Sequence, residues 1–138
     1  DDIKQIGTTK KKIKVTSQEL HEAIMLLKTE LIAKDEATDL FAQERSKGST
    51  EGILGNVMQS FGGNEVYQTL EDKAAHLLYF MVKNHPFTDG NKRSGAFAFI
   101  WFLRNSSKIY TSNFSNSCNF YLSWNHYFPA NLFCNIMS

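Results

Sequence analysis

The sequence predicts a mainly helical domain that carries one small β-hairpin. Two segments begin with a threonine followed three residues later by an acidic residue, and both continue with apolar residues at helical spacing. A third segment, the apolar stretch 96–103, follows a loop that contains proline and glycine. Two adjacent glycines between short segments predict a tight hairpin turn.

Length and composition are those of one soluble domain. The 138 residues suffice for a single core, and a net charge of +1 argues against general nucleic-acid affinity. The lysines at 10–14 are expected to be a solvated terminus. The stretch 96–103 is shorter than the roughly 18 to 20 residues of a membrane span. Cys118 and Cys134 lack metal or redox spacing, so we expect free thiols in the cytoplasm. Because of the net charge and the short apolar stretch, we expect neither nucleic acid nor a membrane as a partner.

The first predicted helix covers residues 17–45. Thr16 and Glu19 form a capping box at its start. The apolar residues that follow at helical spacing are Leu20, Ala23, Ile24, Leu27 and Leu31.

The next segment, 48–63, is rich in glycine and must bend. Segments 57–61 and 64–67 flank Gly62 and Gly63, which predicts a two-residue hairpin because glycine accepts positive φ. No glycine here precedes a Lys-Ser or Lys-Thr pair, which excludes a phosphate loop of that kind.

Thr69 and Asp72 mark the start of a second helix, 70–84, and a third is expected at 91–104. The predicted buried face of the second helix consists of Ala74, Ala75, Leu77, Leu78 and Met81. Pro86 cannot continue this helix, so residues 85–90 form a short loop between two core helices.

That loop and the residues after it, His85 to Arg93, read HPFTDGNKR and combine several chemical groups. The N-terminus of the third helix leaves backbone amides unpaired, which favours phosphate oxygens there. Gly90 is expected to let them approach without a Cβ in the way, and Lys92 and Arg93 add positive charge. We call the unpaired amides at the start of this helix together with the two basic side chains the anion cradle.

The remaining residues of the motif suit catalysis. Asp89 can hold Mg²⁺, which needs few protein ligands beside phosphates and water. An ordinary imidazole has a pKa of about 6.5, so His85 can take a proton from a hydroxyl near neutral pH. Phe87 is expected to point into the core and Pro86 to restrict the backbone. Each residue alone has an ordinary structural explanation, and their occurrence within nine residues favours a functional site.

The motif resembles that of the Fic/Doc family, HxFx[D/E]GN followed by basic residues. The resemblance covers about 51–104, where residues 53–63 and 70–76 look like the flap and preceding helix of bacterial Fic domains. Fic domains of bacterial RhuM-like proteins are similar to this region. Those domains often follow an N-terminal domain, and this chain begins without Met. We therefore expect a fragment of a longer protein.

The resemblance implies a helical Fic fold whose hairpin flap, Phe61, Gly62 and Gly63, docks the target protein. His85 would be the general base, Asp89 the Mg²⁺ ligand, and the backbone from Gly90 to Lys92 the anion hole, with Asn91 orienting the phosphates. The implied co-substrate is ATP or another nucleoside triphosphate, and the acceptor is a Ser, Thr or Tyr hydroxyl. Family reactions include AMP transfer and, in Doc toxins, phosphoryl transfer.

Two departures from the AMP-transferring pattern GNGRxxR favour phosphoryl transfer. Lys92 replaces the second glycine and Ala96 the last arginine. An inhibitory [ST]xxxE[GN] motif is incomplete, because Lys47 precedes Glu51 and Gly52 where Ser or Thr is expected. An antitoxin or other regulatory partner and oligomerisation remain open.

We predict a Fic/Doc-type domain at 1–104 and an atypical tail at 105–138. The tail holds no Asp or Glu, and we hypothesise that it is aberrant or translated out of frame. A rival interpretation is a non-catalytic helical interaction module or a degenerate Fic relative, whose loop merely binds an anion. If residues 105–138 cannot supply helices that cover the motif helix, Phe97, Ile100 and Trp101 are expected to stay exposed. A DNA-binding helical domain is disfavoured because the basic residues are scattered.

Overall fold

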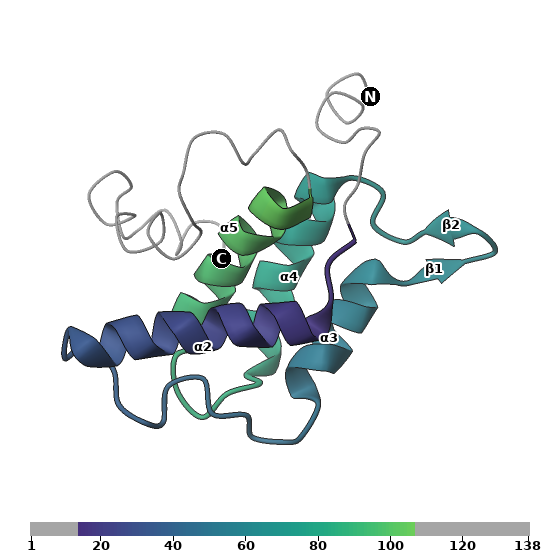
Figure 1. Cartoon of the computed structure of the whole chain (residues 1–138). Helices are drawn as coiled ribbons and strands as arrows, with labels where there is room; N and C mark the ends of the chain where they lie inside the picture. Colours follow the sequence, from purple (N-terminus) through teal and green to yellow (C-terminus); the bar gives the residue numbers. More distant parts are fainter. Residues whose placement is uncertain (1–13, 107–138) are drawn as a thin grey trace.

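The computed structural model describes residues 14–106 and confirms the mainly helical class with one small hairpin (Figure 1). The elements in chain order are α2 (Ser17–Ala33), α3 (Ser49–Met58), β1 (Ser60–Phe61), β2 (Asn64–Glu65), α4 (Leu70–Asn84) and α5 (Asn91–Ser106).

The core lies where the four helices of this part of the chain meet. Helices α4 and α5 pack side by side, α2 crosses in front of them, and α3 contacts both α2 and α4 (Figure 1). Fully buried apolar side chains come from α2, α4 and α5, among them Leu20, Ile24, Leu27, Leu77, Met81, Phe97 and Phe102. Each contributes about 1.5–3 kcal/mol by leaving water. Ala75 is an exception to the predicted buried face, because it lies on the exposed side of α4.

Helix α2 begins as predicted and ends earlier. Thr16 Oγ1 accepts the backbone N–H of Glu19 at 3.2 Å, and the Glu19 carboxylate accepts the N–H of Thr16 at 2.9 Å, which completes the capping box. The predicted extension to residue 45 is wrong. Asp35 adopts φ +59 and ends the helix, and the chain then turns so that Phe41 and Ala42 enter the core.

Helix α3 lies in the glycine-rich segment for which the sequence predicted bends and a hairpin. Its N-cap is Gly48, which has no side chain that could accept a hydrogen bond from the first amides of the helix. The Glu44 carboxylate instead accepts the N–H of Thr50 at 2.9 Å. A negative group at a helix N-terminus is stabilising. Ile53 and Val57 are buried along one face, so tertiary packing holds a helix that contains two internal glycines.

The predicted hairpin turn is confirmed at Gly62 and Gly63, whose φ angles are +59° and +82°. Two central residues with positive φ match the twist of the flanking strands. The strands are shorter than predicted, with Ser60 opposite Glu65 and Phe61 opposite Asn64. Residues 57 and 58, expected in the first strand, belong to α3.

A buried lysine ties the hairpin to α4. The Nζ of Lys73 donates to the Glu65 carboxylate at 3.0 Å and also to the backbone carbonyl of Tyr67. The Lys73 side chain is 2% exposed, and burying its ammonium group would be costly without these hydrogen-bond partners. Tyr67 in turn stacks on the ring of His76 with centroids 3.9 Å apart.

Replacing Lys73 by methionine is expected to loosen the hairpin more than the core. The change keeps the apolar stem and leaves the Tyr67 carbonyl without its donor, which costs about 1–3 kcal/mol. Amide hydrogen exchange of residues 60–66 should become faster. Lys83→Met, at an exposed position near the end of α4, is the matched control. Equal exchange rates in both variants would show that Lys73 does not anchor the hairpin.

The predicted second helix and the loop after it are confirmed. Thr69 Oγ1 accepts the N–H of Asp72 at 3.0 Å at the start of α4, which ends at Asn84, and α5 begins at Asn91. The α5 side chains expected to be exposed in a non-catalytic module, Phe97, Ile100 and Trp101, are at most 5% exposed, so that expectation is wrong.

Two further sequence-based expectations concern membrane spans and the C-terminal tail. No helix in this range is both long enough and apolar enough to span a membrane. The hypothesis of an aberrant tail concerns mainly residues 107–138, which lie outside the described residues.

Candidate active site

A segment distant in sequence holds the loop between α4 and α5. Residues 41–45, which we call the strap, pair with it through backbone hydrogen bonds. The N–H of Ala42 donates to the Asp89 carbonyl at 2.9 Å, and the N–H of Thr88 donates to the Gln43 carbonyl at 2.8 Å. Sequence reasoning missed the strap, because it lay inside the helix predicted for 17–45.

Gly90 is required by this packing. Its φ is +85°, and a Cβ at this position would lie 2.4 Å from two ring carbons of Phe41 in the strap. The absent side chain therefore makes room for Phe41, rather than for an approaching phosphate as the sequence interpretation held. The positive φ itself also favours glycine.

The side chain of Asn91 closes the loop. Its Oδ1 accepts the N–H of Phe87 at 2.8 Å, and its Nδ2 donates to the Phe87 carbonyl at 2.9 Å. Phe87 is 3% exposed and Pro86 is buried, so the predicted inward direction of Phe87 is confirmed. The amide of Asn91 is thus engaged by the backbone in this structure, whereas the sequence interpretation assigned it to phosphates.

Arg93 is also partly engaged. Its Nη1 donates to the Glu36 carbonyl at 2.7 Å, its Nη2 lies 3.8 Å from the Asp89 carboxylate, and its guanidinium lies 4.8 Å from the centre of the Phe41 ring. These contacts hold the chain after α2 against α5. A phosphate at Arg93 would have to share its donors with them.

The backbone part of the anion cradle is present. Within residues 14–106, no acceptor is found for the backbone N–H groups of Asn91, Lys92 and Arg93, the first three residues of α5. Unpaired amides and the helix dipole favour an anion at such an end. The Lys92 side chain is exposed beside it.

His85 and Asp89 border the cradle. His85 is exposed, caps the C-terminus of α4 with φ +49°, and has its Nδ1 3.4 Å from Asn91 Nδ2. The Asp89 side chain is half exposed, and its contact with Arg93 is loose. No group of three or more His, Cys, Asp or Glu side chains suited to a metal occurs in the described part of the chain. A single accessible carboxylate suits Mg²⁺, which takes its other ligands from phosphates and water.

Comparison with known families identifies the family of this chain. The model of a family described as "Fic/DOC family" matches residues 15–103. The chain belongs to the Fic/DOC family. The match includes α2 and the strap as well as residues 51–103 of the region where the resemblance was first noted. Neither a curated protein nor a solved structure matches the chain.

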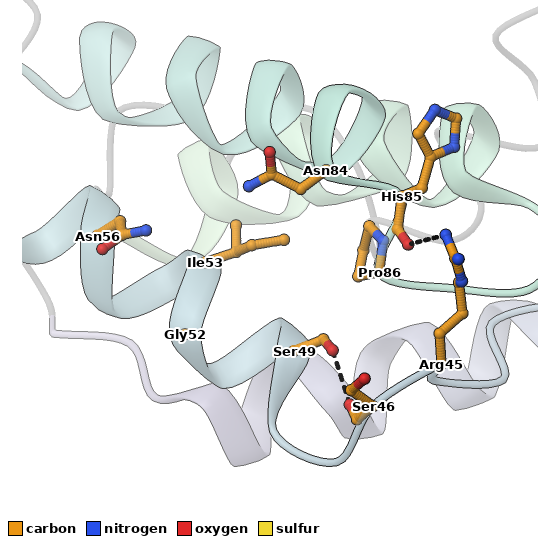
Figure 2. Close-up of a pocket in the computed structure, with 9 residues that line it drawn as sticks. All are labelled: Arg45, Ser46, Ser49, Gly52, Ile53, Asn56, Asn84, His85 and Pro86. Carbon is orange, nitrogen blue, oxygen red and sulfur yellow. Dashed lines mark hydrogen bonds between the residues drawn. The ribbon is translucent and has the colours of Figure 1, made fainter.

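A polar hollow of about 610 Å³ lies beside the Fic/DOC motif, between α3 and the end of α4 (Figure 2). It is lined by Arg45, Ser46, Ser49, Gly52, Ile53, Asn56, Asn84, His85 and Pro86. The His85 imidazole turns away from this hollow, while its carbonyl accepts a hydrogen bond from Arg45 at 3.5 Å. The hollow therefore does not face the His85 imidazole.

The hairpin is not brought to the motif loop of this Fic/DOC chain. It joins the molecule where α4 begins, and the motif loop lies at the other end of α4 (Figure 1). A helix of 15 residues is about 22 Å long. Phe61 is 71% exposed, and none of the described contacts connects Phe61, Gly62 or Gly63 with His85. The predicted docking role of these residues stays a prediction.

Proposed function

We propose that this Fic/DOC domain transfers part of a nucleotide to a Ser, Thr or Tyr hydroxyl of a target protein, with phosphoryl transfer preferred over AMP transfer. One observation carries the proposal: backbone amides at the start of α5 that have no acceptor among residues 14–106 adjoin an exposed imidazole and a half-exposed carboxylate. An anion site, a base and a metal ligand are the groups that the reaction requires.

Each group would have a defined task. The amides of residues 91–93 and the Lys92 ammonium would bind phosphate oxygens of ATP. Bound Mg²⁺, held by Asp89, would neutralise phosphate charge. In phosphoryl transfer the hydroxyl oxygen bonds to the γ-phosphorus, the bond to the bridging oxygen breaks, and ADP leaves. His85 would accept the proton that the hydroxyl loses.

The preference for phosphoryl transfer rests on positions 92 and 96. Lys92 is exposed in the first turn of α5, where its charge adds to that of the amides. Ala96 is buried and offers no group to a terminal phosphate, whereas the AMP-transferring pattern has arginine there. Both differences support a nucleotide bound in another orientation.

Incubation with ATP labelled at either the α- or the γ-phosphorus distinguishes the two reactions. We expect label from the γ-position alone to reach protein in a cell extract, and chelation of Mg²⁺ to abolish the labelling. Label from the α-position would indicate AMP transfer. If neither label is transferred and millimolar MgATP does not raise the unfolding temperature, the proposed function is wrong.

A further inference from the structure

The side-chain amide of Asn91 has only one orientation that its surroundings allow. Its Oδ1 faces the N–H of Phe87 at 2.8 Å, and its Nδ2 faces the Phe87 carbonyl at 2.9 Å. Turning the amide over would set donor against donor and acceptor against acceptor at these distances. The backbone of Phe87 therefore determines which end of Asn91 carries the N–H groups.

The imidazole of His85 lies next to that N–H end. Its Nδ1 is 3.4 Å from Asn91 Nδ2, and it can accept a hydrogen bond only if it carries no proton. A proton on Nδ1 would instead face another N–H group. We infer that Asn91 is a positioning residue that holds neutral His85 of the ligand-free chain in the tautomer with its proton on Nε2.

This tautomer has a consequence for the reaction, which rests on the proposed function. Nε2 with a proton can donate a hydrogen bond but cannot take a proton from a hydroxyl. The lone pair of Nδ1 accepts the hydrogen bond from Asn91 Nδ2. For His85 to act as a base through Nε2, the ring proton must move to Nδ1 and the contact with Asn91 must break. The backbone N–H of Asn91 belongs to the anion cradle, so nucleotide binding beside this residue is the event suited to releasing the base.

His76 has the opposite surroundings in the same chain. Its Nδ1 lies 2.9 Å from the Asp72 carbonyl oxygen and 3.5 Å from the Asp72 carboxylate. Both groups accept hydrogen bonds when the carboxylate is ionised, so the proton of neutral His76 belongs on Nδ1. The two histidines should therefore be opposite tautomers, and His76 serves as an internal control.

Long-range ¹H–¹⁵N correlation spectra identify the ring nitrogen that carries the proton. We expect the ¹⁵N-labelled chain, without nucleotide and at about pH 9 where ordinary imidazoles are neutral, to show His85 protonated on Nε2 and His76 on Nδ1. Loss of signals in His85→Gln assigns the His85 resonances. The same chain unfolded in urea gives the tautomer mixture of an unconstrained imidazole.

Two variants of Asn91 make the test sharper. Asn91→Asp keeps an acceptor for the N–H of Phe87 but presents an acceptor to His85, so the His85 proton should move to Nδ1. Asn91→Ala should give the mixture of the unfolded chain, and His76 should stay unchanged in both. A wild-type His85 with that same mixture, or a proton that stays on Nε2 in Asn91→Asp, would overturn the inference.

The wild-type comparison with the unfolded chain decides the inference even if a variant does not fold. The spectra also need no nucleotide or target. A chain that shows the expected tautomers but transfers no label would contradict the proposed function and leave the positioning role of Asn91 standing. A chain that transfers label but does not show the expected tautomers would contradict only the positioning role of Asn91.

Discussion

Replacing His85 by alanine is expected to lower target labelling by about 10²–10⁴-fold, the usual contribution of a general base. The side chain is exposed, and within residues 14–106 its ring makes one long polar contact, at 3.4 Å to Asn91, so its loss should disturb the fold little. The amides of residues 91–93 belong to the backbone and stay in place. Affinity for MgATP should therefore be retained while the rate falls.

The measurement combines initial rates of label transfer with the MgATP-dependent rise in unfolding temperature. His21→Ala, at an exposed position on α2, is the matched control and should label at the wild-type rate. Labelling by His85→Ala at the wild-type rate would refute the assigned role. If His85→Ala loses both the labelling and the MgATP-dependent rise in unfolding temperature, His85 acts in nucleotide binding instead.

Replacing Gly90 by alanine is expected to produce the largest loss of stability. The new Cβ would meet the Phe41 ring at 2.4 Å, so the ring or the strap must move. Overpacking of this kind costs about 1–3 kcal/mol, and a non-glycine residue held at a φ such as +85° adds about 1–3 kcal/mol. The sum is a large part of the roughly 5–15 kcal/mol that stabilises a typical domain.

Urea unfolding measures this effect directly. Gly55→Ala is the matched control, because Gly55 lies within α3 and has open space where its Cβ would be. That change should be neutral or stabilising by up to about 1 kcal/mol, since alanine favours helix more than glycine does. A Gly90→Ala chain as stable as Gly55→Ala would mean that the contact between Gly90 and Phe41 does not constrain the loop.

Local patterns allowed the sequence to predict the start of α2, all of α4, the start of α5 and the hairpin turn. Thr16 and Thr69 cap helices through hydrogen bonds that span only three residues, and Gly62 and Gly63 adopt the positive φ angles expected of them. The end of α2 and all of α3 could not be predicted in this way. The strap contacts the motif loop, and the cap of α3 comes from Glu44, six residues away from Thr50.

For the candidate site, the sequence by itself determined the residue types, their spacing and the family they resemble. Tertiary structure alone decided how those residues are used. Phe41 occupies the space beside Gly90, Asn91 binds the backbone of Phe87 and faces His85, and Arg93 contacts Glu36. The physical reason is that a motif specifies donors, acceptors and charges, while the partners that satisfy them are brought close only when distant segments pack together.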